Sequence, residues 1–597
     1  MTEIQSKFNI RPRDPEAERP VRLTINGRQV EMEPGSTILE AARKAAVHIP
    51  TLCYMKLEDF DICNDVSACR VCLVDVEGMP RLVTSCSEKV RDGMNVRTDT
   101  PRAVQGRRTS MELLLSNHPP ACLTCAKNLE CELQEVSYQM GIREVSYEGK
   151  RMSHPIDSSS RAIIKEPDKC IMCRRCETMC NEVQTVGVLS ALNRGFDTVV
   201  GSAFHLDLNE TSCTFCGQCV AVCPTGALTE MNETMKVWRA LHNPRKHVVV
   251  QVAPAVRVAI GELFGREPGE IMTGELVSAL RMMGFDAVFD TDWGADLTVI
   301  EEASELVERL QGHGRLPILT SCCPAWVSFI ETQFPDMLDI PSSCRSPQTM
   351  TGAMIKSYYA AKNNLNADDI VVVSIMPCLA KKAEAARPEL SKDENMNVDV
   401  VVSTRELGSM LHQLGIDLSQ LPEDSFDTLL GISSGASVIF GTTGGVIEAT
   451  VRTAAEWLTG EELENVEFSQ LRGFEGVRTA EVAIGDRVLQ IGIAHGLGNA
   501  RKMLEAIRSG VLELDAIEIM ACPGGCIGGG GQPYHHGDAD VLRKRREGLY
   551  TADRSMKIRK AHENPMIAQI YEEYLGEPYG ELAHDLLHTE YTARRRI

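Results

Sequence analysis

Two runs of four cysteines have a spacing that is typical of iron–sulfur proteins. Both runs read Cys-x2-Cys-x2-Cys-x3-Cys, over residues 170–180 and 213–223, and Pro224 follows the second run. In ferredoxin repeats of this kind, the fourth cysteine of each run binds the cluster of the other run. We therefore expect two [4Fe–4S] clusters with these ligands: Cys170, Cys173, Cys176 and Cys223 for one, and Cys180, Cys213, Cys216 and Cys219 for the other. Zinc is a weak alternative, because zinc sites pair two Cys-x2-Cys units.

Two more groups of possible metal ligands precede these runs. The first is a set of four cysteines that one long loop could bring around a two-iron cluster: Cys53, Cys69, Cys72 and Cys86. Fifteen residues separate Cys53 from Cys69, and Cys63 in this gap is a spare thiol or replaces one of those two. The second group offers one imidazole and three thiolates: His118, Cys122, Cys125 and Cys131. Zinc and an iron–sulfur cluster both suit such ligands, and spacing alone does not decide between them.

Four cysteines of the carboxyl-terminal half follow predicted strands. They are Cys323, Cys378, Cys522 and Cys526. Ligands in α/β folds collect beyond the carboxyl ends of strands, so these thiols could converge from distant segments on one buried site. Proline and glycine residues beside them allow close backbone approach and rigid placement. Zinc is a poor alternative for cysteines that lie so far apart in the sequence.

The elements that must position these residues change in character along the chain. Residues 21–32 alternate apolar and polar around Asn26-Gly27, which predicts two strands joined by a tight turn. Thr37 and Glu40 form a capping box that opens a short helix. From about residue 246, short apolar runs alternate with helical stretches. This pattern predicts parallel sheets with crossover helices and strands at 247–252, 316–319, 370–375, 488–493 and 516–520.

Length and charge limit the classes of protein that fit. A chain of 597 residues is too long for one hydrophobic core, so we expect several domains. The net charge of −21 argues against a nucleic-acid partner. No apolar run approaches the ~20 residues that span a membrane, and the polar amino terminus lacks a secretory signal. We therefore expect a cytoplasmic protein, in which the 22 cysteines serve metal or redox chemistry and not disulfides.

The carboxyl-terminal half resembles the catalytic domain of iron-only ([FeFe]) hydrogenases. Three signatures of that family occur in order: Thr-Ser-Cys-Cys-Pro-x-Trp at 320–326, Met-Pro-Cys-x-x-Lys at 376–381, and a glycine-bracketed cysteine pair at 522–526. The amino-terminal ligands resemble those of a region that these enzymes share with a large subunit of respiratory complex I. That region begins with the β-grasp fold of plant-type ferredoxins. The resemblance covers nearly the whole chain.

The resemblance implies a specific set of cofactors. One [2Fe–2S] cluster would be bound by the four cysteines of the first loop, and a [4Fe–4S] cluster by His118 and its three cysteines. With the two ferredoxin-like clusters, this makes three relay [4Fe–4S] clusters. The catalytic domain would hold an H-cluster, a [4Fe–4S] cubane joined to a diiron subcluster that carries CO, cyanide and a dithiolate. Cys323, Cys378 and Cys522 would bind the cubane, and Cys526 would bridge to the diiron unit.

The resemblance also implies a proton route and a pocket. The residues that match the family's route are Glu305, Ser342, Glu302 and Cys322, the last being a thiol that can give and take a proton beside the metal. The two glutamates would share a helix face, for which a solvated face is the plain alternative. Lys381 matches a lysine that donates a hydrogen bond to a cyanide ligand. The remaining pocket residues would be Ser346, Gln348, Met376, Met520 and Ala255, which stands where some members have serine.

The expected fold class is multidomain α+β and α/β. In order, the chain would contain a polar segment (1–18), a β-grasp [2Fe–2S] domain (19–100), a one-His/three-Cys domain (101–145), a two-cluster ferredoxin-like domain (146–240), an α/β catalytic domain (241–541) and a wrapping tail (542–597). Cys344 has no expected ligand role and is predicted to be a small buried hydrophobe.

Together these features predict a hydrogenase that catalyses 2H⁺ + 2e⁻ ⇌ H₂ and exchanges electrons through its relay clusters. The chain lacks the Gly-x-Gly-x-x-Gly pattern of a dinucleotide site, so we expect NAD(P) and flavin to be bound by partner subunits resembling those of complex I. Such a hetero-oligomer could also bifurcate electrons between ferredoxin and NAD. The alternative is a ferredoxin-dependent monomer. A non-catalytic iron–sulfur assembly or sensory protein is the candidate from another class, although such relatives generally lack the Cys322, Glu302 and Lys381 set.

Overall fold

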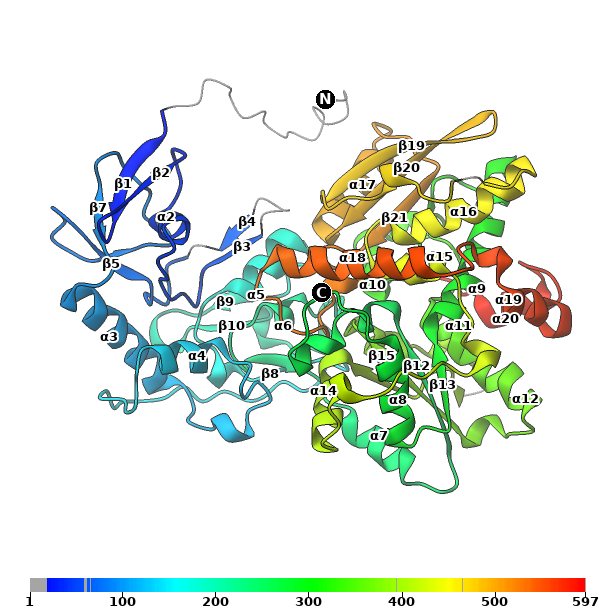
Figure 1. The fold of residues 1–597 in the computed structure, drawn as a ribbon, viewed down its shortest axis with the longest axis horizontal. Coiled ribbons are helices and arrows are strands. Elements are labelled where there is room, and N and C mark those ends of the chain that lie inside the picture. The colour runs from blue at the N-terminus through cyan, green and yellow to red at the C-terminus, as the bar shows by residue number, and fades with distance from the viewer. Residues whose placement is uncertain (1–18, 58–61, 65, 393–394, 464, 596–597) are drawn as a thin grey trace.

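The computed structural model describes residues 19–57, 62–64, 66–392, 395–463 and 465–595 (Figure 1). The expected polar segment 1–18 lies outside these ranges. A small amino-terminal domain lies at one edge of the molecule, and the larger carboxyl-terminal part fills the other side. Among the described helices, none combines the length and the apolar character needed to cross a bilayer.

The amino-terminal domain contains a five-stranded sheet of order β2-β1-β7-β5-β6. Its strands are β1 (Val21–Ile25), β2 (Arg28–Met32), β5 (Leu73–Val76), β6 (Val83–Thr84) and β7 (Asn95–Arg97). The predicted hairpin is confirmed: β1 and β2 pair antiparallel, and Asn26 and Gly27 have φ values of 48° and 79°, as a tight primed turn requires. The predicted helix is α2 (Ile38–Lys44), and its capping box between Thr37 and Glu40 is present.

A second hairpin projects from this domain and was not predicted. It consists of β3 (Met55–Leu57) and β4 (Ile62–Asn64), which pair antiparallel. It lies within the long gap between Cys53 and Cys69. Figure 1 shows β3 and β4 on the side of the amino-terminal domain that faces the rest of the molecule.

The next segment connects the amino-terminal domain to a two-cluster region. Helix α3 (Pro101–Asn117) is followed directly by His118, its C-cap residue, and α4 (Glu132–Gln139) begins directly after Cys131. The two-cluster region contains the antiparallel pairs β8 (Ile163–Lys165) with β11 (Leu228–Glu230) and β9 (Ser190–Leu192) with β10 (Val199–Gly201). The two cysteine runs fold alike, because each leads through a left-handed residue into a short helix, α5 (Arg175–Thr178) or α6 (Gln218–Ala221).

The carboxyl-terminal part contains two four-stranded sheets. In the first, β13 (Ala287–Asp290), β12 (His247–Val252), β15 (Ile370–Met376) and β18 (Val400–Ser403) are all parallel. The second has the order β14 (Ile318–Leu319), β21 (Ala516–Met520), β20 (Arg487–His495), β19 (Val477–Ile484).

The five predicted strand regions are therefore strands, although β14 is shorter than expected. The prediction of purely parallel sheets is wrong at β19, which pairs antiparallel with β20. β19 is an edge strand with several exposed or half-buried residues, so its sequence lacks the continuous apolar run of a buried parallel strand.

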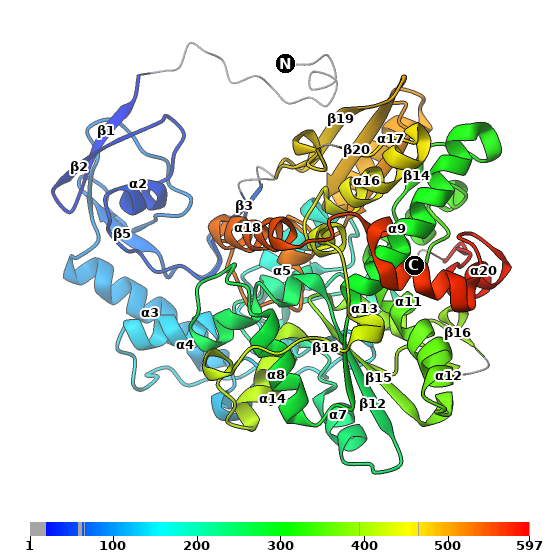
Figure 2. The same ribbon diagram turned by 45° about the vertical axis from the view of Figure 1, so that its right-hand side comes forward.

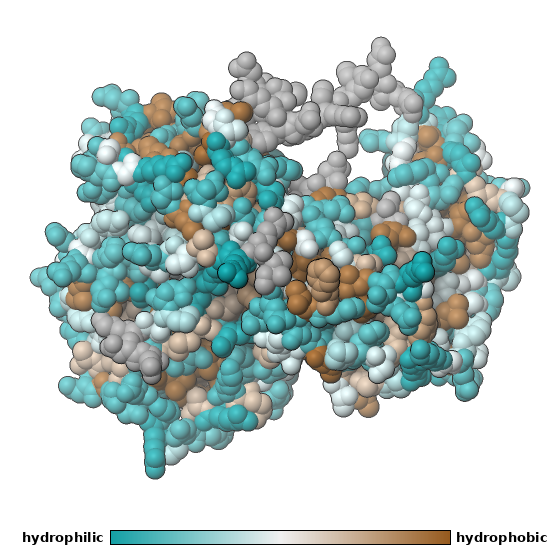
Figure 3. Space-filling view, turned by 180° about the vertical axis from the view of Figure 1, so that it is seen from behind, coloured by the Kyte–Doolittle hydropathy of each residue, from teal (hydrophilic) through white to brown (hydrophobic). Residues whose placement is uncertain are grey.

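Helices surround both sheets and lie between them. The longer ones are α7 (Thr234–Leu241), α8 (Thr273–Met283), α9 (Thr291–Glu308), α10 (Pro324–Gln333), α11 (Pro347–Met354), α14 (Thr404–Gln413), α16 (Gly445–Thr459) and α17 (Leu497–Arg508). Helix α9 packs against both α11 and α16. The carboxyl-terminal helices α18 (Ala539–Ser555), α19 (Pro565–Ile570) and α20 (Glu581–Leu587) lie across this part of the molecule, with α19 against α9 and α20 against α11 (Figure 2). The face opposite to that of Figure 1 is mostly hydrophilic, with small scattered hydrophobic patches (Figure 3).

Candidate functional site

The first group of cysteines comes together in one buried site. Cys53, Cys69, Cys72 and Cys86 are each at most 3% exposed. The Sγ atoms of Cys72 and Cys86 are 3.4 Å apart, and Cys53 contacts both Cys69 and Cys86. Hydrogen bonds from Cys69 and Cys86 lower the pKa of Cys53, and the same hydrogen bonds raise the pKa of Cys69 and of Cys86, so these thiols titrate as one group. Cys63 is exposed on β4, outside this group.

The second group surrounds a cavity between α3 and α4. Its lining includes His118, Cys122, Cys125 and Cys131. Burial lowers the pKa of His118 to about 4, so the imidazole is neutral, as a metal ligand must be. Its Nδ1 atom is buried and has no hydrogen-bond partner among the described residues. A buried imidazole nitrogen of this kind is suited to bind a metal, because an unpaired polar atom is otherwise costly.

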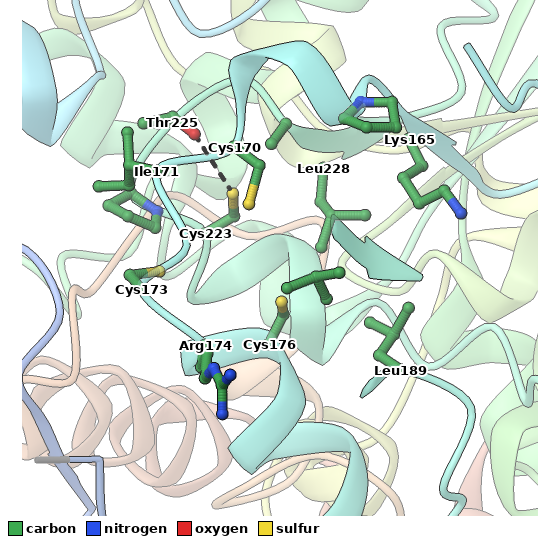
Figure 4. Close-up of a pocket in the computed structure, with 14 residues that line it drawn as sticks. Lys165, Cys170, Ile171, Cys173, Arg174, Cys176, Leu189, Cys223, Thr225 and Leu228 are labelled. Atoms are coloured by element: carbon green, nitrogen blue, oxygen red, sulfur yellow. Dashed lines mark hydrogen bonds between the residues drawn. The ribbon is translucent and has the colours of Figure 1, made fainter. Parts of the chain in front are cut away.

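The two cysteine runs exchange their fourth members. One cavity is lined by Cys170, Cys173, Cys176 and Cys223, and the other by Cys180, Cys213, Cys216 and Cys219. Figure 4 shows the four sulfur atoms of the first around a common space, while the Arg174 side chain points away. This is the crossed arrangement expected of a two-cluster ferredoxin.

Desolvation makes ionisation of these thiols unfavourable without a cation. Burial raises the pKa of both Cys170 and Cys216 to about 11. The remaining lining of the first cavity is largely apolar, as Ile171 and Leu228 illustrate. Iron would supply the missing positive charge, because metal binding deprotonates the cysteines that coordinate it. The donor set therefore fits iron–sulfur clusters.

The four catalytic-domain cysteines converge from three strands. Cys323 follows β14 and caps α10, Cys378 follows β15, and Cys522 and Cys526 follow β21. Burial and the nearby thiols of Cys323 and Cys526 raise the pKa of Cys378. Burial and the nearby Cys323 thiol also raise the pKa of Cys526, to about 12. Thiols from positions 200 residues apart in the sequence thus face one another.

Glycine residues allow the backbone to approach this site closely. Gly525 has φ of 97°, and a Cβ atom there would lie 2.7 Å from the Thr443 nitrogen. A Cβ atom at Gly530 would lie 2.7 Å from the carbonyl oxygen of Gly217. A larger residue at Gly530 would push the loop that carries Cys526 away from the two-cluster region, and one at Gly525 would push it away from Thr443.

The second ferredoxin-like cavity lies directly against the catalytic cysteines. Gln218, which follows Cys216 by two residues, donates a hydrogen bond of 2.9 Å to the Gly528 carbonyl. Gln184 donates one of 2.8 Å to the carbonyl of Ala521, next to Cys522. Burial and nearby thiols, among them Cys216, raise the pKa of Cys522. The Cys216 side of this cavity therefore lies next to Cys522.

The residues expected to move protons are buried together. Glu302 and Glu305 lie on α9 and are 2% and 3% exposed, so the solvated-face alternative is wrong. The Ser342 hydroxyl donates a hydrogen bond of 2.8 Å to Glu305. Burial raises the pKa of Glu302 to about 8. Burial and then the Glu302 carboxyl raise the pKa of Cys322 well above its ordinary value, so these two groups are electrostatic neighbours.

Lys381 and its neighbours share one carboxylate. The Nζ atom of Lys381 donates to the Cys322 carbonyl at 3.1 Å and contacts Glu384 at 2.8 Å. The side chains of Ser346 and Gln348 donate to the same Glu384 oxygen at 3.0 and 3.1 Å. Glu384 therefore holds three pocket residues in place. The sequence did not lead us to Glu384. Its position three residues after Lys381 on the same helix was a signal that could have been used.

The other expected pocket residues lie in the core around the cysteines. Met376 and Met520 end β15 and β21, and Cys322 and Cys526 pack against the core cluster that contains both. Ala255 is fully buried, and its carbonyl accepts a hydrogen bond from Gln532. Cys344 is 1% exposed, in agreement with its expected burial.

Arg309 was also missed. It forms an ion pair with Glu305 and donates to the Ile340 carbonyl at 2.8 Å, near Ser342. The spacing of four residues between Glu305 and Arg309 would place them on one helix face, which was a usable signal.

Family models match most of the chain. The "Iron only hydrogenase large subunit, C-terminal domain" matches residues 246–530, and the "Iron hydrogenase small subunit" matches 539–594. Before them come a 2Fe-2S iron-sulfur cluster binding domain (18–101), the NADH-ubiquinone oxidoreductase-G iron-sulfur binding region (107–146) and a 4Fe-4S dicluster domain (169–227).

Some individual relatives align with nearly the whole chain, and others with its larger part. The NADP-reducing hydrogenase subunit HndD of Solidesulfovibrio fructosivorans is 55% identical over 96% of this chain and 99% of its own. Iron hydrogenase 1 of Clostridium pasteurianum is 36% identical over 95% and 99%. The cytosolic Fe-S cluster assembly factor narfl of Xenopus tropicalis is 30% identical over 64% and 84%. Among solved structures, apo [FeFe]-hydrogenase HydA1 from Chlamydomonas reinhardtii has 42% identity and a TM-score of 0.54, covering 60% of this chain and 98% of that one.

Proposed function

This chain belongs to the iron-only hydrogenase family, and we propose that it is the catalytic subunit of an NAD(P)-linked hydrogenase complex. It is an oxidoreductase that acts on hydrogen, 2H⁺ + 2e⁻ ⇌ H₂. The observation that carries the NAD(P) link is the 55% identity to an NADP-reducing hydrogenase subunit over almost the whole of both chains. The ferredoxin-dependent monomer is less favoured by this similarity.

The proposed cofactor set is one [2Fe–2S] cluster, three relay [4Fe–4S] clusters and the H-cluster. The relay ligands would be the four groups described above, with the crossed pairing of the two ferredoxin-like runs supported by their two separate cavities. Cys323, Cys378 and Cys522 would hold the cubane, and Cys526 would bridge to the diiron unit. We propose the domain boundaries expected from the sequence, including a β-grasp fold for the first domain and a wrapping role for the tail.

The diiron unit, when bound, supplies an open metal position at which hydrogen is made or cleaved. This chain's residues would hold and move protons beside it. Cys322 would exchange a proton at its Sγ atom, next to the buried Glu302 carboxyl, with Ser342 and Glu305 linking toward the surface. Lys381, held by Glu384, would place a positive charge against an anionic ligand in a dry pocket. Apolar packing from Met376 and Met520 would exclude water.

The partners would be flavin-containing subunits that reduce NAD(P), with ferredoxin as a possible second electron carrier in a bifurcating complex. We propose a cytoplasmic hetero-oligomer. The test is anaerobic co-purification from cells that express the maturation machinery, followed by hydrogen uptake assays with NAD⁺ or NADP⁺, with and without ferredoxin. Hydrogen-dependent NAD(P)⁺ reduction by the co-purified complex is expected. A lone chain that evolves hydrogen from reduced ferredoxin but never couples to NAD(P) would overturn the proposed complex.

A further inference from the structure

The hairpin β3–β4 docks the amino-terminal domain onto the two-cluster region. Met55 and Leu57 of β3 are buried against Met179, Val183 and Val222 of that region. These five side chains form an apolar cluster of their own. The insertion between Cys53 and Cys69, which contributes no expected ligand, is therefore a contact surface between two cluster-binding domains.

The last residue of this hairpin connects two cluster loops. Asn64 is 1% exposed, and its Nδ2 atom donates hydrogen bonds to the backbone carbonyls of Cys53 (2.5 Å) and Cys173 (3.0 Å). Cys53 belongs to the proposed [2Fe–2S] site, and Cys173 to the first ferredoxin-like site. One amide group thus bridges a ligand residue of each cluster. Because carbonyls only accept hydrogen bonds, the amide nitrogen must face them.

A second contact holds the amide in this orientation. The hydroxyl of Thr178 donates a hydrogen bond of 2.7 Å to the Asn64 Oδ1 atom. Thr178 is buried and follows Cys176, another ligand of the same ferredoxin-like site, by two residues. Both the nitrogen and the oxygen of the Asn64 amide therefore have hydrogen-bond partners. A buried polar group that is fully hydrogen-bonded in this way stabilises one relative position of the two loops.

The surroundings of this bridge exclude water. Cys53, Cys69, Cys131 and Cys173 belong to one cluster of buried apolar side chains, which also contains Leu52 and Ile171. Three cluster sites therefore meet at a single dry core. In such an environment a neutral hydrogen-bonded amide links the two loops without adding a net charge, and its N–H dipole points toward both ligand residues.

We propose that Asn64 is a positioning residue that couples the [2Fe–2S] site to the adjacent [4Fe–4S] site for electron transfer. The inference rests on the cluster assignment proposed above. In each transfer one electron leaves the first cluster and one electron reaches the second, so charge balances. No bond breaks at Asn64 and no proton moves. Its amide fixes the separation of the two loops, and its dipole favours the reduced, more negative form of both clusters.

The test uses the full chain with all clusters loaded under anaerobic conditions. Asn64→Leu keeps the branched heavy-atom shape of the side chain but removes both N–H donors and the Oδ1 acceptor, and Thr178→Val removes only the orienting hydroxyl. Redox titration followed by electron paramagnetic resonance measures the potential of each cluster. In Asn64→Leu we expect the [2Fe–2S] cluster and the Cys173 cluster to shift to more negative potentials, while the clusters at His118 and Cys213 do not shift. Thr178→Val should give a smaller shift in the same direction.

The same variants report on docking. In Asn64→Leu, hydrogen exchange at the β3–β4 amides should accelerate about tenfold, because two buried carbonyls lose their donor. Cys63→Ser, a change on the same strand at an exposed position, should leave the potentials and the exchange unchanged. Unchanged potentials in Asn64→Leu with both clusters present would overturn the inference. Absence of the [2Fe–2S] signal from the wild-type chain would instead overturn the cluster assignment, so the two failures are distinguishable.

Discussion

At the scale of single residues, Glu302 has the surroundings of a proton carrier. It is buried on α9, its Oε1 atom accepts a long hydrogen bond of 3.4 Å from the Ser321 backbone, and Oε2 has no partner among the described residues. Burial raises its pKa to about 8, far above the ordinary 4.5. The carboxyl is therefore mostly protonated at neutral pH and lies close to its titration point, as efficient general acid–base catalysis requires.

The raised pKa predicts how hydrogen production depends on pH. Above pH 8, Glu302 loses its proton, so the rate of hydrogen evolution should fall as pH rises through about 8. The free energy of unfolding should also decrease as pH rises. The folded protein favours the protonated form of Glu302, and the stability that this gives is lost as pH rises through the folded pKa. Glu302→Gln should reduce evolution about 10²–10⁴-fold and remove this step from the pH profile. Wild-type rates in Glu302→Gln, measured by gas chromatography, would contradict its role.

Cys322 can be compared with a second buried thiol. Cys322→Ala should leave the iron content unchanged but lower turnover about 10²–10⁴-fold, because it removes a proton donor and not a ligand. Cys344→Ala is the matched control: Cys344 is also buried, and its Sγ atom lies 4.0 Å from His588 Nδ1. We expect near-normal turnover in Cys344→Ala. Equal losses in the two variants would show that packing, and not proton transfer, explains the effect.

At the scale of elements, the two ferredoxin-like runs depend on each other. Each run supplies three cysteines to one cavity, the third of them on a short helix (α5 or α6), and its fourth cysteine to the other cavity. The strand pair β8–β11 brings the beginning and the end of this region together. In the proposed assignment, neither run would therefore complete its cluster without the other.

Because each run places its fourth cysteine in the cavity of the other run, a substitution in one run should affect the cluster of the other. Cys223→Ser, in the second run, should destroy the cluster of Cys170, Cys173 and Cys176 in the first run. Cys180→Ser should instead affect the cluster of the second run. Electron paramagnetic resonance of the reduced variants separates the two signals. If Cys223→Ser removed the signal that Cys213→Ser removes, the pairing would be uncrossed.

The carboxyl-terminal tail is a second element with a defined role. Its segment after α20 pairs with the segment that carries Ser342: Thr589 donates to the Ser343 carbonyl at 2.8 Å, and Tyr591 donates to the Ser342 carbonyl at 2.6 Å. His588 lies 3.0 Å from Glu301, and both side chains are fully buried. The tail therefore clamps the segment that carries Ser342 and also contacts α9 through His588.

Removing His588 should destabilise this clamp. His588→Ala removes one hydrogen-bond partner of the buried Glu301 carboxylate, which also accepts from Tyr571 and Tyr579, at a cost of about 1–3 kcal/mol in the free energy of unfolding. Scanning calorimetry should show a lower melting temperature for the catalytic part. Glu590→Ala, at an exposed neighbouring position, should melt like the wild type. Identical melting of His588→Ala and the wild type would mean that the pair contributes little.

At the scale of the whole molecule, apolar cores connect the cluster sites in sequence. One core contains Cys53, Cys69, Cys131 and Cys173, and a second contains Cys176, Cys223 and Cys378. Adjacent sites are thus separated by packed side chains and not by solvent. An electron relay of the proposed clusters would run from the amino-terminal domain, through the crossed pair of cavities, to the catalytic cysteines.

This arrangement separates two kinds of activity. Cys72→Ser should remove the [2Fe–2S] cluster and most NAD(P)-linked hydrogen uptake, if partner subunits deliver electrons through the amino-terminal domain. Hydrogen evolution from reduced methyl viologen, a small dye that can reach other clusters, should be largely retained. Loss of both activities to the same degree would place the [2Fe–2S] site on an obligatory route for every donor.

The sequence by itself determined the features that depend on neighbours along the chain. Ligand spacing within each run, the Asn26-Gly27 hairpin, the capping box and the apolar strands are local patterns, and the physics that produces them acts over a few residues. The edge strand β19 was missed because an edge position needs no continuous apolar run. The helix spacing of Lys381 with Glu384, and of Glu305 with Arg309, was local too and could have been used.

Only the tertiary structure decided which distant groups meet. Asn64 lies 109 residues from Cys173, and His588 lies 287 residues from Glu301. No spacing rule predicts such pairs, because each contact follows from the packing of whole domains. The burial that raises the pKa of Glu302, and the dry core that joins three cluster sites, are likewise properties of that packing.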